Sequence, residues 1–228
     1  MILILNDLLN ITDIATFQTA LGPDAPWIAG QSSAGGQAVT QKNNLQLAQD
    51  SDIAKTLQQR ILQAVQSDPL FFSAALPLKL FNPLFNCYSG DANHYGPHID
   101  GAILHSKQNS QRVRTDLSCT VFLNDPEDYD GGELIVHDTY GTKSIKLPAG
   151  SAVLYPGTSL HEVRPVTHGQ RLASFFWIES MVRSDEQRRL LFDLDMNLLK
   201  LRQQLGETPE CTALTGTYHN LLRMWANT

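Results

Sequence analysis

Three residues in the middle of the chain could together hold a metal ion. His98 and Asp100 are separated by a single residue, and His161 follows 63 positions after His98. On an extended strand, residues i and i+2 point to the same face, so an imidazole and a carboxylate at this spacing can bind one cation. The pair alone is common by chance, and its meaning depends on whether His161 delivers a second nitrogen ligand from another strand.

A single arginine could place a positive charge beside such a metal. Arg171 lies ten positions beyond His161, across a turn at 165–169, and a hairpin centred near Val166 would bring the two residues roughly opposite each other. Apolar residues follow Arg171, and burying its charge there is costly without an anionic partner. Its planar fork suits a carboxylate. A nearby phenol, Tyr88, could donate a second hydrogen bond to that carboxylate, and the alternative is a core tyrosine with a satisfied hydroxyl.

Longer strings extend this pattern from the middle of the chain to its C-terminus. The strings are RTDLS at 114–118, FLNDPEDYDGGEL at 122–134, HEVRPV at 161–166, ASFFWI at 173–178 and YHNLL at 218–222. With them, the sequence resembles the Fe(II)- and 2-oxoglutarate-dependent dioxygenases. The closer similarity is to the bacterial PKHD-type hydroxylases, which are related to prolyl and procollagen-lysine hydroxylases.

The resemblance implies a role for each candidate residue. It makes His98, Asp100 and His161 the Fe(II) ligands and Arg171 the clamp on the far carboxylate of 2-oxoglutarate, with Tyr88 as a helper. The chemistry of the ligands agrees, because two imidazoles and one carboxylate on one face of an octahedral ion leave three positions open. That arrangement is typical of non-haem iron oxygenases and unlike a closed structural zinc site.

The resemblance also implies a reaction. Members of the family decarboxylate 2-oxoglutarate oxidatively to succinate and carbon dioxide and hydroxylate a substrate C–H bond, with L-ascorbate as auxiliary reductant. The implied cofactors are therefore Fe(2+), 2-oxoglutarate as cosubstrate and ascorbate, and O2 is the second cosubstrate. The resemblance leaves the substrate open between a peptidyl proline or lysine and a small molecule of siderophore-like character.

The elements that must position these residues are mainly strands. Residues 76–179 consist of short apolar runs divided by turn signals, such as Asn-Asp-Pro at 124–126 and Asp-Gly-Gly at 130–132. Evenly placed short strands are typical of sandwiches and jelly rolls. We therefore predict an α+β, mainly β fold, a double-stranded β-helix braced by helices at both ends. Its expected parts are an N-terminal support region at 1–79, a jelly-roll core at 80–179 and a C-terminal helical extension at 180–228.

The sequence of the C-terminal extension predicts two helices. Ser184 and Gln187 have capping-box spacing, and leucines recur on one side of the following segment as far as Leu205. That side should pack on the barrel. Leu191, Leu198 and Leu205 also fall at heptad spacing, which leaves a homodimer through these helices as a second option.

Composition excludes several classes of protein. Lys and Arg number 17 against 23 Asp and Glu, so the formal charge of −6 argues against binding to nucleic acid. No window of about 18 apolar residues predicts a membrane span. Three cysteines, at positions 87, 119 and 211, have no zinc-site or disulfide spacing, which favours a reduced, cytoplasmic location.

Some assignments stay open from the sequence alone. Arg112, Arg114 and Asp116 could face the substrate or form a structural ion pair, and His94 fits no pattern. A non-catalytic jelly roll that senses a metal or oxo acid is the main alternative function. A zinc hydrolase is disfavoured, because its general base would have to be Glu162, which points to the strand face opposite His161.

Overall fold

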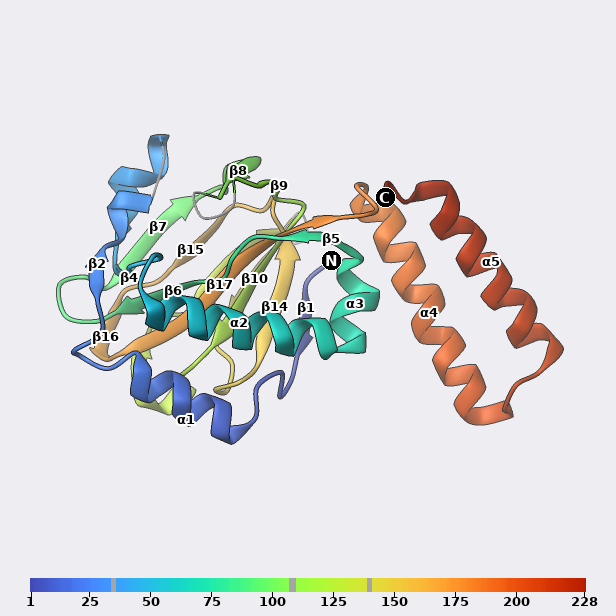
Figure 1. The fold of residues 1–228 in the computed structure, drawn as a ribbon, viewed down its shortest axis with the longest axis horizontal. Helices are drawn as coiled ribbons and strands as arrows, with labels where there is room; N and C mark the ends of the chain where they lie inside the picture. Colours follow the sequence, from blue (N-terminus) through green and yellow to red (C-terminus); the bar gives the residue numbers. More distant parts are fainter. Residues whose placement is uncertain (34–35, 107–109, 139–140) are drawn as a thin grey trace.

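Two antiparallel sheets face each other and form a jelly roll. The computed structural model describes residues 1–33, 36–106, 110–138 and 141–228. Figure 1 shows the sheets at the centre of the molecule, with helices against one side and a helical hairpin at the end. The larger sheet has the order β1-β14-β10-β17-β6-β4-β2, with β5 also pairing to β17, and the smaller sheet has the order β13-β12-β15-β7-β3. The predicted fold class is confirmed.

The strands of the larger sheet are β1 (Leu3–Leu5), β2 (Trp27–Ala29), β4 (Leu45–Leu47), β5 (Pro77–Leu80), β6 (Leu84–Tyr88), β10 (Leu117–Phe122), β14 (Ala152–Pro156) and β17 (Arg171–Ser180). Those of the smaller sheet are β3 (Lys42–Asn43), β7 (His94–His98), β12 (Leu134–Asp138), β13 (Gly141–Ile145) and β15 (His161–Val163). Two further pairs are β8 (Ile103–His105) with β9 (Arg112–Arg114), and β11 (Tyr129–Gly131) with β16 (Val166–Gly169). Short 3-10 turns cover η1 (Gly30–Ser33), η2 (Gly36–Gln41) and η3 (Pro126–Asp128).

Three helices cover the outer face of the larger sheet. They are α1 (Ile11–Ala20), α2 (Asp52–Ser67) and α3 (Pro69–Ala75). The apolar side of α2 carries Leu57, Ile61 and Val65, which are fully buried in one cluster with Phe85 and Phe176 of the sheet. This cluster is the main core, and it leaves the opposite face of the sheet free to line an internal pocket.

Alternation along the strands decides which side chains enter that pocket. On β17, Leu172 and Phe176 belong to the helix-side core, whereas Arg171 and Phe175 line the cavity between the sheets. The period of two that defines a strand thus separates the core residues from the site residues.

The hairpin expected between His161 and Arg171 is wrong. β15 pairs with β7 and β12 in the smaller sheet, whereas β17 pairs with β10 and β6 in the larger sheet. The intervening β16 pairs with β11 instead, so the chain crosses from one sheet to the other. His161 and Arg171 therefore approach the same pocket from opposite sheets and do not face each other across a turn.

The C-terminal segment is a helical hairpin that extends from the end of β17 (Figure 1). It consists of α4 (Asp185–Leu205) and α5 (Pro209–Trp225), and the amide of Gln187 donates to the Ser184 hydroxyl at the predicted cap. Leu191 and Leu198 are buried in a cluster with Tyr218 of α5. Two of the three heptad leucines are thus used within the chain, and the homodimer stays a prediction.

No helix among the described residues has the length and apolar character that crossing a bilayer requires.

Candidate active site

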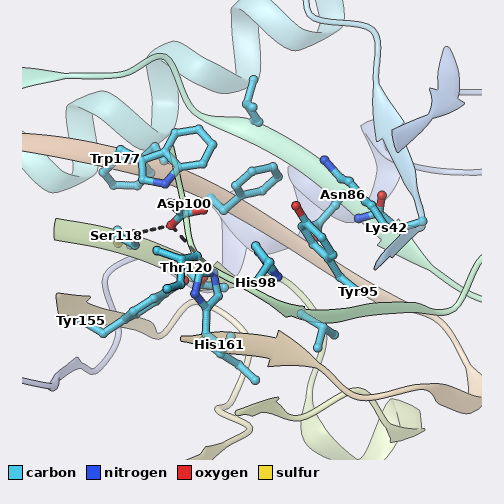
Figure 2. A pocket seen from close by; sticks show the side chains of 18 of the residues that line it. Lys42, Asn86, Tyr95, His98, Asp100, Ser118, Thr120, Tyr155, His161 and Trp177 are labelled. Carbon is cyan, nitrogen blue, oxygen red and sulfur yellow. Dashed lines mark hydrogen bonds and ion pairs between the residues drawn. The ribbon is translucent and has the colours of Figure 1, made fainter. Parts of the chain in front are cut away.

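A pocket of about 540 Å³ lies between the two sheets, and Figure 2 shows its walls. The strands β6, β10 and β17 of the larger sheet line one side, and β7 and β15 of the smaller sheet line the other. The charged or titrating side chains that line it, apart from its tyrosines and a cysteine, are Lys42, His98, Asp100, His161 and Arg171.

The structure brings together the three residues that the sequence singled out as metal ligands. One ligand atom from each of His98, Asp100 and His161 can be chosen so that all lie within 4.8 Å of one another. The shortest approach between an imidazole and the carboxylate joins His161 Nε2 and Asp100 Oδ2 at 3.8 Å. His98 ends β7 and pairs in register with His161 on the neighbouring β15, so the two strands fix the separation of the imidazoles.

Backbone hydrogen bonds fix which nitrogen of each imidazole faces the centre. His98 Nδ1 lies 2.8 Å from the Gly96 carbonyl oxygen, and His161 Nδ1 lies 3.0 Å from the Ser159 carbonyl oxygen. A carbonyl oxygen only accepts, so each Nδ1 must carry the proton and each Nε2 presents a lone pair. This is the tautomer that a metal-binding histidine needs.

Neighbouring side chains hold the three residues in place. The Ser118 hydroxyl donates to Asp100 Oδ2 at 2.8 Å, which Figure 2 marks as a dashed line. The Tyr95 ring stacks on the His98 imidazole with centroids 3.5 Å apart and planes 11° from parallel. Tyr155 meets His161 edge-on at 5.2 Å. The rings and the hydroxyl limit the rotamers that the three residues can adopt.

The protonation of His98 suits cation binding. Burial, and then the nearby His161, lowers the pKa of His98 to about 4. The imidazole is therefore neutral at pH 7 and does not require a proton to be displaced before a cation binds.

Arg171 lies deep in the same pocket. It is 1% exposed, and its Nε and Nη1 atoms have no hydrogen-bond partner among the described residues. The guanidinium carbon lies 5.2 Å from the ring centroids of both Tyr88 and Phe122, so two aromatic faces flank the cation. Since a buried guanidinium without an anion is costly, this end of the pocket is built to receive one.

Tyr88 lies beside Arg171 as the sequence led us to expect, and the two residues are register partners on β6 and β17. Burial raises the pKa of the Tyr88 phenol, and the Arg171 charge opposes that rise. The Asn86 amide donates to the Tyr88 hydroxyl at 3.4 Å. The phenol is thus neutral and keeps its own proton to donate.

Other residues left open by the sequence lie outside the pocket lining. Arg114 forms a two-point ion pair with Asp116, with nitrogen-to-oxygen distances of 2.7 and 2.8 Å, which is the structural alternative. Arg112 is exposed on β9. His94 contacts the neighbouring Asn93, with 2.9 Å between Nδ1 and Oδ1. Glu162 pairs with Arg164 at 3.3 Å.

Sequence reasoning missed Lys42. It comes from β3, more than 50 residues before His98 in the chain, and reaches the pocket because β3 pairs with β7. Lys42 is 4% exposed, and burial lowers its pKa to about 8, although Asp100 opposes that shift. A lone lysine after a polar stretch carries no local signal, and only the long-range strand pairing shows its position.

Comparison with known proteins identifies the family. The 2OG-Fe(II) oxygenase superfamily matches residues 83–179, and the PKHD-type hydroxylase C-terminal domain matches residues 185–227. A PKHD-type hydroxylase of Polaromonas sp. is 58% identical over the full length of both chains, and one of Verminephrobacter eiseniae is 55% identical over the same extent.

A solved structure supports the fold alone. A prolyl-4-hydroxylase of Pseudomonas putida has a TM-score of 0.50 and 15% identity, and the match covers 78% of this chain and 92% of that one. The full-length relatives and the two family matches together show that the chain is an enzyme of the PKHD-type hydroxylase family, within the 2OG-Fe(II) oxygenase superfamily.

Proposed function

We propose that this protein uses Fe(II), 2-oxoglutarate and O2 to hydroxylate a C–H bond of a second substrate. His98, Asp100 and His161 would hold the iron, and Arg171 with Tyr88 would hold the far carboxylate of 2-oxoglutarate. One observation carries the proposal: two nitrogens of the buried Arg171 guanidinium have no acceptor among the described residues, and they lie in the same pocket as the cluster of two histidines and an aspartate.

The three ligands fit iron by their chemistry. Two neutral imidazole nitrogens and one carboxylate form the donor set that non-haem Fe(II) oxygenases use, whereas structural zinc sites are closed by four ligands. The Nδ1 protons of His98 and His161 are held by backbone carbonyls, and Ser118 orients the Asp100 carboxylate. When bound, the iron would supply the redox chemistry that activates O2.

The Arg171 end of the pocket fits a carboxylate. The planar guanidinium can donate two parallel hydrogen bonds, and a neutral Tyr88 hydroxyl can add a third. The rings of Tyr88 and Phe122 flank the guanidinium and shield it from water, which strengthens its attraction for an anion. The residues thus bind and orient the cosubstrate before any chemistry occurs.

The overall reaction balances as follows. One O2 supplies one oxygen atom to the substrate C–H bond, which becomes C–OH, and the other to 2-oxoglutarate. The bond between the keto carbon and the near carboxylate of 2-oxoglutarate breaks, which gives carbon dioxide and succinate. The pocket walls would keep water out and hold the substrate C–H bond near the metal, and Phe175 and Trp177 line that space.

We extend the proposal to features that the family suggests. Ascorbate would serve as auxiliary reductant, and the division at 1–79, 80–179 and 180–228 would mark the functional parts of the chain. The three cysteines are free and buried, which fits the proposed cytoplasmic location. The second substrate would be a small molecule or a peptide, without nucleic acid or membrane as partner.

The proposal is tested by anaerobic reconstitution. The protein is loaded with Fe(II), and 2-oxoglutarate is added while the metal-to-ligand charge-transfer band is recorded. Oxygen is then admitted and succinate is measured. The proposal expects the band with the wild type and its loss with His161→Ala. A band without any succinate, even in uncoupled turnover, would instead favour a non-catalytic sensor, and the absence of a band would contradict the proposed reaction.

A further inference from the structure

A second strong cation, besides Arg171, lies in the pocket wall. Lysine and arginine occur at only two positions among the described residues that line the cavity, Lys42 and Arg171. The aliphatic stem of Lys42 is buried within the wall, and Figure 2 shows its side chain on the same side of the cavity as Asn86 and Tyr95. The pocket therefore offers positive charge at two places.

Strand pairing and aromatic rings fix the position of Lys42. It is the register partner of Tyr95 across the β3–β7 pair. Its Nζ lies 5.2 Å from the Tyr95 ring centroid and 6.0 Å from that of Phe175. The Tyr95 ring also stacks on the His98 imidazole. The ammonium of Lys42 is thus held close to the three candidate metal ligands, although Lys42 is not one of them.

Lys42 and Arg171 lie at different positions in the pocket, measured along β17. Arg171 contacts the rings of Tyr88 and Phe122, whereas Lys42 contacts those of Tyr95 and Phe175. Phe175 lies four residues beyond Arg171 on the same strand face, which corresponds to about 13 Å along β17. A carboxylate bound to Arg171 therefore leaves room for a second anion beside Lys42.

The cavity continues from Lys42 to an apolar rim. Phe175 and Trp177 pack edge to face with centroids 5.5 Å apart. Ile99 and Leu160 also line the cavity and are 58% and 40% exposed. Exposed aliphatic side chains at the rim and aromatic rings inside are suited to an apolar ligand body.

We propose that Lys42 is a specificity residue that binds a carboxylate of the primary substrate, whose apolar or aromatic body lies against Phe175 and Trp177. This inference rests on the proposed function and narrows its substrate class. An ammonium held away from bulk water attracts the oxyanion of an acid more strongly than it attracts the neutral amide of the same shape.

Matched pairs of acids and amides test the inference. The probes are benzoate with benzamide, phenylacetate with phenylacetamide and 3-phenylpropionate with 3-phenylpropionamide. Each is titrated by calorimetry into the anaerobic protein saturated with Fe(II) and 2-oxoglutarate, and the charge-transfer band reports whether 2-oxoglutarate stays bound. With at least one pair, the wild type should bind the acid about tenfold more tightly than the amide, the order expected for one charge-assisted hydrogen bond.

Three variants assign that preference to Lys42. Lys42→Met should reduce the acid-to-amide ratio to below about twofold, and Lys42→Arg should retain part of it. Lys55→Met, which changes an exposed lysine on α2, is the control and should keep the wild-type ratio. Thermal unfolding shows that each variant is folded.

Three results would overturn the inference. They are the absence of acid preference in the wild type for all three pairs, persistence of the preference in Lys42→Met, and a loss of 2-oxoglutarate affinity in Lys42→Met equal to the loss for the acid. The last result would place Lys42 at the cosubstrate. Since the band and succinate formation of the wild type need no probe, a failure of the proposed function is recognised separately.

Discussion

One end of the pocket is defined by a single buried residue, Arg171, whose positive charge has no anionic partner among the described residues. Arg171 is the first residue of β17. Because side chains alternate along a strand, Arg171 points toward the cavity and Leu172 points toward the core. Stability alone would favour an apolar residue at such a position. The arginine is better explained by the anionic cosubstrate that we propose it binds.

Arg171→Met should therefore separate cosubstrate binding from metal binding. Because hydrogen bonds to a charged group contribute about 2–3 kcal/mol, we expect 2-oxoglutarate to bind about 30- to 150-fold more weakly, with little change in Fe(II) affinity. Anaerobic titrations that follow the charge-transfer band and the bound metal measure both constants. Arg164→Met, which changes an exposed arginine on the preceding connection, is the control. Equal losses of metal and cosubstrate would contradict the assigned role.

A hydroxyl next to the candidate metal ligands allows a second prediction. Ser118 donates to Asp100 at 2.8 Å, and removal of such an orienting group typically weakens metal binding roughly 10- to 100-fold. Ser118→Ala should lower Fe(II) affinity by that order. Ser174→Ala is a matched control, because Ser174 is fully buried on β17 and its hydroxyl has no partner among the described residues. If both variants bound iron equally, Ser118 would have no positioning role.

At the scale of elements, a glycine makes room for Arg171. Gly132 has φ of +68°, and a Cβ there would lie 2.9 Å from both Tyr129 and Val166 side chains and 3.0 Å from Arg171 Cδ. Gly90 also has positive φ, but a Cβ there would meet nothing within 4 Å. The two glycines thus share a backbone requirement and differ in their surroundings.

Gly132→Ala should consequently impair both stability and cosubstrate binding. In Gly90→Ala the free energy of unfolding should fall by only about 1 kcal/mol, because the alanine must adopt a positive φ but meets no neighbouring atoms. Gly132→Ala should lose more in the free energy of unfolding and should also weaken 2-oxoglutarate binding, because the added methyl group displaces Arg171. Denaturant titration and the charge-transfer band measure the two effects. Normal cosubstrate affinity in a folded Gly132→Ala protein would show that Arg171 tolerates the displacement.

The carboxylate of Glu179 links the end of β17 to β5 and β9 by hydrogen bonds. Glu179 accepts hydrogen bonds from the Arg114 amide and the Lys79 ammonium, each at 3.1 Å. Burial acts to raise the pKa of the Glu179 carboxyl, but these donors outweigh it and the pKa is lowered from 4.5. A carboxyl with a lower pKa in the folded state stabilises the fold above about pH 4.5, and this contribution is lost as the pH falls through the folded-state value.

Glu179→Gln should therefore be less stable than the wild type at pH 7, and the difference should shrink as the pH falls below about 4.5. Denaturant unfolding between pH 3 and pH 7 measures it. Glu127→Gln, which changes an exposed glutamate, should show no such convergence. A stability difference that is constant with pH would mean that the carboxylate charge is not what stabilises this junction.

At the scale of the whole molecule, local patterns in the sequence predicted more of the strands than of their partners. The cap at Ser184 depends on nearby sequence and is confirmed, and Arg171 faces the pocket although it does not pair with His161. The predicted hairpin between His161 and Arg171 was wrong because pairing with β11 draws β16 away. Lys42 was missed because its place depends on a strand contact with β7, which no local spacing encodes.

The arrangement of cores also predicts how the protein responds to metal removal. The residues packed between α1, α2, α3 and the larger sheet form a cluster that contains none of His98, Asp100 and His161. A chain of 228 residues buries enough surface to fold without a metal. Treatment with a chelator should therefore leave the far-ultraviolet circular dichroism spectrum unchanged. Loss of the helix and strand signal in that spectrum would mean that the metal is required for folding.

Ligands should then stabilise the folded protein in two separable steps. Each ligand present at 100 times its Kd contributes about 2.7 kcal/mol, and for a domain of this size 1 kcal/mol corresponds to roughly 2–4 °C in Tm. Anaerobic Fe(II) should raise the Tm of the metal-free protein by about 5–10 °C, and 2-oxoglutarate should add a similar increment. Arg171→Met should keep the first increment and lose the second, because its metal ligands are intact and its carboxylate clamp is absent. Loss of both increments would show that the two sites form as one unit.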